Sequence, residues 1–225
     1  MSTAAPYDAL VAAHGLSAAH RMLVDAVPPG SRVLDVGCST GYLGAVLAAT
    51  GCQVVGVEQD ERAALRARAR DVIADVLIGS VDDEDVLSRI AEHGPYDAIV
   101  CGDVLAHVPR PEATLQALVA QLADGGRVAI SLPNVAHWTA RRAFLRGQFP
   151  REDDGLFARA HLRFFSLAGV RGLLHAAGLN AVEEGYTPAL LPLQAQFPSL
   201  RHLQRPLLRL RPELFAEQLV LVGER

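Results

Sequence analysis

The fold is decided by the stretch Val33-Leu34-Asp35-Val36-Gly37-Cys38-Ser39-Thr40-Gly41-Tyr42-Leu43-Gly44. An apolar run rich in β-branched residues stops at Gly37 and a helix-like pattern begins at Tyr42, which predicts a strand, a tight glycine-rich turn and a helix. Dinucleotide folds place glycines as G-x-G-x-x-G around a pyrophosphate, whereas Ser39 stands at the second glycine position here. The turn is therefore of the nucleotide-binding kind, but it does not favour a pyrophosphate.

Apolar runs recur along the first 132 residues, with amphipathic segments between them. Strands are predicted at 33–36, 53–58, 75–78, 96–101 and 127–132. Helices are predicted between them, from residue 42 and at 60–70, 82–92 and 111–123. Strands and helices that alternate at short spacing are typical of a doubly wound parallel sheet. The sequence therefore predicts an α/β fold with helices on both faces of the sheet.

The rest of the chain departs from this alternation. Residues 1–30 are predicted as an N-terminal helical cap, and residues 31–225 as one domain. Residues 133–165 lack a clean period and carry aromatic and basic side chains, so we interpret them as an irregular lid. The last predicted parts are a helix at 166–177, a strand at 179–186, an insertion at 188–212 and a strand at 219–222.

Composition excludes several classes of function. The chain has 21 basic and 25 acidic residues, and its net charge of −4 gives no basic face for nucleic acid. No apolar run reaches the roughly 18 residues of a membrane span and no signal sequence opens the chain, so we expect a cytoplasmic protein with no membrane partner. All basic residues are arginine. The lack of lysine excludes a phosphate-loop lysine and a lysine Schiff base.

Three cysteines, Cys38, Cys52 and Cys101, lie in or beside predicted strands and form no C-x-x-C pair. This pattern favours reduced thiols in the core over disulfides or a zinc site.

An acidic residue ahead of G-x-x-x-G, here Asp35 before Gly37 and Gly41, resembles motif I of the class I S-adenosylmethionine (SAM) methyltransferases. The resemblance implies a Rossmann-like sheet of seven mostly parallel strands in the order 3-2-1-4-5-7-6, with a small lid. It also implies SAM as the cofactor and S-adenosylhomocysteine as the product. Motif I alone leaves open an ordinary strand and helix joined by a glycine turn.

Acidic and polar residues follow the second and third predicted strands. Glu58 lies roughly 20 residues after the glycine turn, from where a carboxylate reaches both ribose hydroxyls of a nucleoside. Such a charge-assisted hydrogen bond contributes about 1.5–3 kcal/mol. The alternative is an exposed acid at a helix start. Ser80, Val81 and Asp82 lie where an adenine edge is expected, and Ser80 replaces an aspartate common in the family. Capping of the next helix by Ser80 or Asp82 is compatible with that role.

The run Asp103-Val104-Leu105-Ala106-His107-Val108 resembles the family's segment that approaches the methionine half of SAM. Ala106 replaces a glutamate that some relatives use for a metal, so we predict no bound metal. A stoichiometric divalent ion in purified, active protein would overturn this. His107 follows Asp103 by four residues, so on a helical turn the two share a face and can orient one another. His107 is either a general base or a hydrogen-bonded structural histidine.

Three later runs resemble the bacterial methyltransferases related to the methionine-biosynthesis W group, which are methyltransferase type 11/12-like. Relatives of this group also occur beside polysaccharide and natural-product genes. The runs are Ser131–Trp138, Arg146–Phe149 and His161–Ser166. The resemblance places this block over the expected methyl group. There the predicted acceptor pocket contains His137, Trp138, His161, Arg163 and Phe164. Its aromatic rings would exclude water and an arginine would pair with an acidic group of the substrate. For each residue alone, packing of the lid is the alternative.

Methyl transfer is an in-line displacement, so the protein has mainly to align the nucleophile with the methyl carbon. A general base is needed only when the acceptor is a hydroxyl of high pKa. The candidate catalytic bases are His107, His137 and His161. The candidate cofactor-binding residues follow the ends of the first four predicted strands, and are Asp35, Gly37, Cys38, Ser39, Gly41, Tyr42, Glu58, Gln59, Ser80, Val81, Asp82, Asp103 and Val104.

The first hypothesis for the function is SAM-dependent methyl transfer to a small-molecule or carbohydrate-like acceptor. We expect O-methylation in a secondary-metabolite or polysaccharide pathway, that is, natural product biosynthesis, by a monomer or homodimer. The second hypothesis is a SAM-binding accessory or regulatory protein of a partner enzyme. A nicotinamide-linked reductase is the third, and Ser39 disfavours it.

Overall fold

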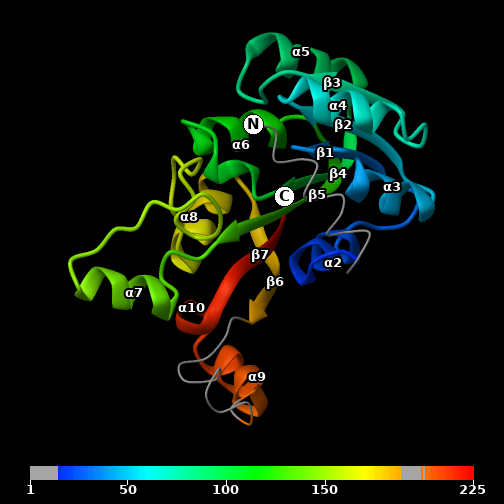
Figure 1. The fold of residues 1–225 in the computed structure, drawn as a ribbon. Coiled ribbons are helices and arrows are strands. Elements are labelled where there is room, and N and C mark those ends of the chain that lie inside the picture. Colours follow the sequence, from blue (N-terminus) through cyan, green and yellow to red (C-terminus); the bar gives the residue numbers. More distant parts are fainter. Residues whose placement is uncertain (1–14, 189–198, 200) are drawn as a thin grey trace.

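The computed structural model describes residues 15–188, 199 and 201–225. Its centre is one sheet of seven strands in the order β3-β2-β1-β4-β5-β7-β6, which confirms the predicted order (Figure 1). The first five strands run parallel, and β7 is antiparallel to both β5 and β6. The strands are β1 (Arg32–Val36), β2 (Gln53–Glu58), β3 (Asp75–Ile78), β4 (Tyr96–Gly102), β5 (Leu122–Pro133), β6 (Asn180–Pro188) and β7 (Ala216–Glu224).

Helices cover both faces of the sheet, because alternate residues of each strand point to opposite faces. Val33 packs with α2 and α3, whereas Leu34 and Val36 belong to the larger core cluster under α5, α6 and α8. The helices are α2 (Ala18–Asp25), α3 (Tyr42–Ala49), α4 (Glu61–Arg68), α5 (Glu84–His93), α6 (Pro111–Val119), α7 (Trp138–Leu145), α8 (Leu167–Ala176), α9 (Arg201–Leu210) and α10 (Pro212–Phe215).

The register of the parallel strands aligns their carboxyl ends. Val36 is paired with Val57 of β2 on one side and with Cys101 of β4 on the other. Glu58 at the end of β2 is paired with Ile78 at the end of β3. The loops that follow these four strands therefore meet at one edge of the sheet, where open α/β sheets bind their ligands.

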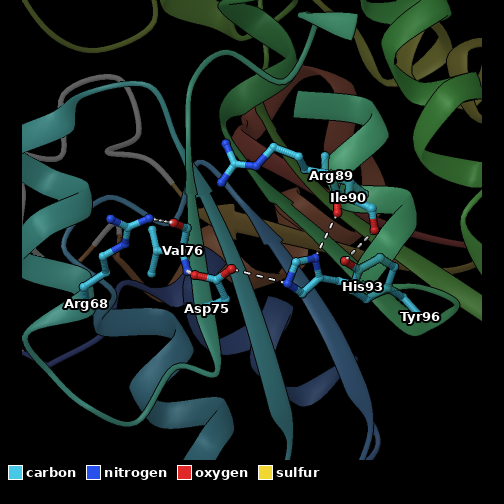
Figure 2. A network of polar contacts seen from close by, with 7 residues as sticks. All are labelled: Arg68, Asp75, Val76, Arg89, Ile90, His93 and Tyr96. Carbon is cyan, nitrogen blue, oxygen red and sulfur yellow. Dashed lines mark hydrogen bonds and ion pairs between the residues drawn. The ribbon is translucent and has the colours of Figure 1, made fainter. Parts of the chain in front are cut away.

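A polar network holds β3, α5 and β4 together at the opposite edge (Figure 2). His93 contacts the Asp75 carboxylate at 3.3 Å through Nε2, and its Nδ1 lies 2.9 Å from the Arg89 carbonyl. The hydroxyl of fully buried Tyr96 donates to the Ile90 carbonyl at 3.0 Å, as a buried phenol requires. The network fixes the end of α5 against the strands and does not involve the carboxyl edge of the sheet.

Helix α6 ends at Val119 and not at residue 123, and three further elements differ from the sequence prediction. Residues 138–145 form helix α7 inside the segment expected to be irregular, because the His137 side chain caps its first turn. Strand β5 begins at Leu122, not at residue 127, since Leu122 pairs with Tyr96 ahead of the Asp124-Gly125-Gly126 bend. Strand β7 extends over Ala216–Glu224, because β5 and β6 flank it along most of its length.

Parts of the expected organisation lie outside the described residues: positions 1–14 of the N-terminal cap and positions 189–198 and 200 of the insertion. Within the described part of the chain, no helix has the length and apolar character needed to cross a membrane.

Candidate functional site

A cavity of about 810 Å³ lies at the carboxyl edge of β1, β2, β3 and β4. Its size is within the range of small-molecule sites. Most of the predicted cofactor and catalytic residues line it. These are Gly37, Ser39, Tyr42, Glu58, Gln59, Ser80, Val81, Asp103, Val104, His107 and His161. Asp35, Cys38, Gly41, Asp82 and His137 lie outside its lining.

The floor of the cavity is the glycine turn after β1. The amides of Gly37 and Cys38 both donate to the Val57 carbonyl, at 2.8 and 3.0 Å, which ties the turn to β2. Gly37 has a φ of +71°, and a Cβ placed there would lie 2.4 Å from a methyl carbon of Val104. Gly37 therefore keeps the turn open beside Val104, so that a ligand can approach the backbone.

Glu58 joins the ends of β1 and β2. Its two carboxylate oxygens accept hydrogen bonds from the backbone amides of Ser39 at 2.9 Å and Asp60 at 2.8 Å. A carboxylate has about four acceptor positions, so lone pairs remain for two hydroxyl donors in the cavity. The carboxylate is thus held in place at the wall of the cavity, as binding of a ribose would require.

Asp35 lies beneath the turn and is almost fully buried, with 2 % of its surface exposed. Burial, and secondarily the negative charge of Glu58, raises its pKa to about 7. One carboxylate oxygen of Asp35 is buried without a hydrogen-bond partner. Cys38 is also buried, and burial raises the pKa of its thiol, which leaves it a neutral side chain of the core.

The polar residues after β3 do not cap α5. Ser80 donates its hydroxyl hydrogen bond to the Asp82 carboxylate, and α5 begins at Glu84 with Asp83 in the cap position. The alternative role of Ser80 or Asp82 as a helix cap is therefore not observed, because these two side chains are paired with each other. Ser80 and Val81 line the cavity, whereas Asp82 does not.

Asp103 follows β4 and is held from two distant strands. Its carboxylate accepts from the Ser131 hydroxyl of β5 at 3.2 Å and from the Gln218 amide of β7 at 2.9 Å. Removal of the carboxylate from water raises its pKa, and the nearby His20 partly offsets this. The expected mutual orientation of Asp103 and His107 is not observed, because Asp103 is engaged with Ser131 and Gln218 while His107 bonds elsewhere.

His107 and His161 face one another at the cavity wall, with ring centroids 4.9 Å apart in an edge-on arrangement. Nδ1 of His107 lies 3.1 Å from the Ala160 carbonyl, and Nδ1 of His161 lies 3.1 Å from the Leu156 carbonyl. A carbonyl only accepts, so each neutral ring carries its proton on Nδ1 and its lone pair on Nε2. Loss of solvent, and then the neighbouring His161, lowers the pKa of His107.

Backbone and arginine hydrogen bonds hold the segment between α7 and α8 against the loop that contains His107. The amides of Leu162 and Arg163 donate to the Ala106 carbonyl at 2.8 and 3.1 Å. The Arg163 guanidinium donates to the Pro109 carbonyl at 3.0 and 2.6 Å. Of the predicted acceptor-pocket residues His137, Trp138, His161, Arg163 and Phe164, only His161 lines the cavity. Arg163 is engaged with backbone, and Phe164 packs edge-on against Phe149 with ring centroids 5.4 Å apart.

His137 has a structural place in this fold. Its Nδ1 accepts from the Thr139 amide at 3.4 Å and lies 2.7 Å from the Thr139 hydroxyl, so the ring caps α7. Its Nε2 is buried and has no hydrogen-bond partner. Burial lowers the pKa of His137 to about 4. We therefore leave His137 out of the proposed catalytic set.

The low pKa of His137 predicts a loss of stability in acid. Between its ordinary pKa of 6.5 and about 4, the unfolded chain binds a proton that the folded chain does not, so stability falls as pH falls through this window. At pH 5 the cost is about 2 kcal/mol. Urea unfolding at pH 7.5 and at pH 5 measures the free energy of unfolding. Between these pH values the wild type should lose about 2 kcal/mol more of it than His137→Asn, which retains a capping acceptor.

Exposed His175 provides the control, because His175→Asn should lose stability between the two pH values as the wild type does. An equal loss in wild type and His137→Asn would show that His137 is protonated in the folded protein.

The sequence reasoning missed several residues of the cavity lining, among them Asp60 and two groups from distant segments. His20 of α2 lines it, and its Nε2 lies 3.2 Å from the Tyr42 hydroxyl. Asp153, Asp154 and Ala160 line it from the segment between α7 and α8. No local spacing in the sequence connects residue 20 to residue 42. His20 reaches the cavity because α2 packs against α3 and the sheet.

The charged residues of the cavity lining are all acidic. They are Glu58, Asp60, Asp103, Asp153 and Asp154, and the described lining contains no arginine. In the described residues, no three His, Cys, Asp or Glu side chains come together as a metal-ligand set. The prediction of no bound metal stays a prediction.

A methyltransferase domain model matches residues 12–184, which is most of the chain. The chain belongs to this methyltransferase family. A curated relative, the ubiquinone biosynthesis O-methyltransferase of Shewanella halifaxensis, is 35% identical over 105 residues, which are 47% of this chain and 44% of that protein. The corresponding protein of Xanthomonas axonopodis is 35% identical over 111 residues, 48% of this chain and 45% of that one. The chain thus matches less than half the length of these relatives.

Solved structures share the fold at low sequence identity. A SAM-dependent methyltransferase of Thermotoga maritima, described as a possible histamine N-methyltransferase, superposes with a TM-score of 0.63 at 19% identity over 97% of this chain and 94% of that one. The magnesium protoporphyrin IX methyltransferase of Synechocystis, with bound S-adenosylhomocysteine, gives a TM-score of 0.58 at 20% identity over 99% of this chain and 83% of that one. SAM is the cofactor of this family.

The residues of the cavity fit that cofactor. Gly37 leaves the turn without a side chain at that position. Glu58 holds an oriented carboxylate at the cavity wall, and Ser80 and Val81 also line the cavity. An acidic wall also suits a cofactor that carries a sulfonium and an ammonium charge.

Proposed function

We propose that the protein transfers the methyl group of SAM to a hydroxyl oxygen of a small, uncharged acceptor, including carbohydrate-like ones. The observation that carries this proposal is the position of His107. It lies at the wall of the same cavity as the glycine turn, with the lone pair on Nε2. The name of the curated relatives, ubiquinone biosynthesis O-methyltransferase, supports oxygen as the methylated atom.

The chemistry needs positioning and removal of one proton. Bound SAM supplies a methyl carbon attached to a positive sulfur. The acceptor oxygen would displace the sulfur from this carbon in one in-line step, and Nε2 of His107 would accept the hydroxyl proton. The Ala160 carbonyl holds the ring by Nδ1 and stabilises the imidazolium that forms. His161, packed edge-on against it, favours release of that proton.

The charge of the cavity narrows the acceptor class. Asp153, Asp154 and His161 all belong to its lining, and the described lining contains no arginine. An acceptor with a phosphate or carboxylate would therefore meet like charge without a partner, which disfavours it. This replaces the expectation that an arginine of the lid pairs with an acidic substrate.

A methyl-transfer assay tests the proposal. The purified chain is incubated with SAM and matched acceptors that differ in one group: a phenol, a sugar hydroxyl, an amine and a phosphorylated form of the best hydroxyl acceptor. We expect methylated product by mass spectrometry from a hydroxyl acceptor and little from its phosphorylated form. Transfer to the amine alone, or SAM binding without transfer to any class, would contradict the proposal.

The cofactor part of the proposal predicts the effect of Glu58→Gln. The substitution replaces one carboxylate oxygen by a donor that faces a backbone amide and removes the charge offered to the ribose. We expect affinity for SAM and for S-adenosylhomocysteine to fall about 30-fold, since a charge-assisted hydrogen bond contributes about 1.5–3 kcal/mol. Isothermal titration calorimetry measures both ligands.

The matched control is Glu61→Gln, which removes an exposed carboxylate at the start of α4. Its affinity for both ligands should equal that of wild type within about twofold. Unchanged affinity in Glu58→Gln would remove Glu58 from the cofactor site.

A further inference from the structure

Helix α9, Arg201–Leu210, carries leucine and arginine side chains on different faces. Leu203, Leu207 and Leu210 are spaced by four and three residues, which places them on one face. Arg205 and Arg209 are four residues apart and share another face. Leu203 is 49% exposed and Leu210 is 73% exposed. The helix therefore holds large apolar side chains in contact with water.

Leu208 fixes the orientation of the helix. It packs against the main hydrophobic core, whereas Leu203 and Leu210 lie on the side turned away from it. Figure 1 shows α9 at the far end of the molecule, beyond the tip of β6 and well away from the parallel strands. The exposed leucines therefore lie on a protruding part of the fold, where a large flat surface can reach them.

The sequence around α9 has a charge opposite to that of the rest of the chain. Residues 185–212 contain four arginines and no aspartate or glutamate. The whole chain has 21 basic and 25 acidic residues, so without these four arginines its net charge would be −8 instead of −4. Arg205, Arg209 and Arg211 are exposed. Positive charge is therefore concentrated beside the exposed leucines on an otherwise acidic protein.

We propose that α9 is an interfacial helix that binds the protein to the surface of a lipid bilayer with anionic headgroups. A helix with leucines on one face and arginines on another inserts its apolar face at the boundary of headgroups and acyl chains, while its arginines contact anionic lipid. The leucine face requires an apolar partner and the arginines require a negative one, and an anionic bilayer supplies both. Surface binding of this kind needs no membrane-spanning segment, so the expectation of no membrane partner is revised at this helix.

The position of α9 also relates the membrane to the cavity. Strand β6 is parallel to β5, because both are antiparallel to β7. The carboxyl end of β6, from which the chain continues to α9, therefore lies at the same edge of the sheet as the cavity. Binding through α9 therefore turns the carboxyl edge of the sheet toward the bilayer.

Vesicle flotation tests the proposal with the full chain. Vesicles of phosphatidylcholine alone are compared with vesicles of phosphatidylcholine mixed with phosphatidylglycerol. We expect the protein to float with the mixed vesicles and to stay behind with phosphatidylcholine alone. Raised salt should release it, because the arginine contribution is screened. No flotation with the mixed vesicles would overturn the proposal.

Two double variants separate the apolar and the charged contribution. Arg205→Gln with Arg209→Gln should weaken binding to the mixed vesicles about 30-fold, since each basic residue near an anionic surface contributes about 1 kcal/mol. Leu203→Gln with Leu210→Gln should abolish flotation although the charge is unchanged. The matched control is Leu65→Gln with Leu145→Gln, which changes two leucines that are exposed elsewhere, by 51% and 90%.

Three results would contradict the proposal. One is an equal reduction of flotation in the α9 leucine double variant and in the control double variant. Another is flotation that persists when both α9 arginines are replaced. The third comes from light scattering after size exclusion: a dimer of wild type that the α9 leucine variant converts to a monomer, without vesicle binding by either, would assign the face to a second copy of the chain. Calorimetric affinity for S-adenosylhomocysteine, unchanged in every variant, verifies that each one is folded.

Discussion

Replacement of His107 by glutamine is expected to lower the rate of methyl transfer about 10²- to 10³-fold while SAM affinity stays within about twofold of wild type. General base catalysis contributes factors of this size, and glutamine keeps a donor for the Ala160 carbonyl but cannot take up a proton. The measurement is single-turnover methyl transfer to the hydroxyl acceptor found in the acceptor assay, with calorimetry for the cofactor.

The pH dependence distinguishes a base from a merely structural histidine. Because the pKa of His107 is lowered from 6.5, the wild-type rate should stay on its plateau below pH 6.5 and fall only in stronger acid. His107→Gln should lose this acidic limb. Exposed His175 on α8 provides the control, since His175→Gln should leave both the rate and the profile unchanged. A wild-type rate in His107→Gln together with a slow His161→Gln would assign the base to His161.

Replacement of Gly41 by alanine is expected to destabilise the fold by about 3 kcal/mol. Gly41 has a φ of +77°, and a Cβ there would lie 2.7 Å from Cδ1 of Ile73 and 3.0 Å from Cβ of Ala67. Left-handed backbone costs a residue with a side chain about 1 kcal/mol, and overpacking of this contact adds about 2 kcal/mol. Urea unfolding at neutral pH measures the free energy of unfolding.

Gly125→Ala separates these two contributions. Gly125 has a φ of +73°, and a Cβ there would meet nothing within 4 Å, so only the conformational cost of about 1 kcal/mol applies. The difference between the two variants is then the steric cost of approaching α4 and Ile73. Equal losses in Gly41→Ala and Gly125→Ala would show that the packing around Gly41 relaxes without cost.

Much of the fold, and the residues of the proposed cofactor side of the cavity that lie near one another, could be predicted from sequence, because the relevant signals are local. The break from strand to glycine turn to helix at Gly37 and Tyr42 is a change of period within twelve residues. Glu58 is found by counting from that turn to the end of the next strand. Parallel strands in register then bring the two together, with the Ser39 amide 2.9 Å from the Glu58 carboxylate.

The acceptor side could not be predicted in the same way, because its contacts join distant segments. His107 and His161 are 54 positions apart, and His20 reaches the cavity only through the packing of α2. His137 and Arg163 were predicted as pocket residues from their residue types. In the structure His137 caps α7, and Arg163 donates to the Pro109 carbonyl. Residue type indicates what a side chain can do, and the backbone groups within its reach decide what it does.

The sequence by itself thus determined the alternation of strands and helices, the glycine turn and the acidic residue at the end of β2, since each depends on neighbours along the chain. The strand order was an expectation from the resemblance to a known family. Only the tertiary structure decided which histidines share the cavity, which arginines are already bound to carbonyls, and which leucines of α9 stay in water. Those outcomes depend on distances between elements that no local pattern encodes, and they set the proposed acceptor class and the proposed membrane surface.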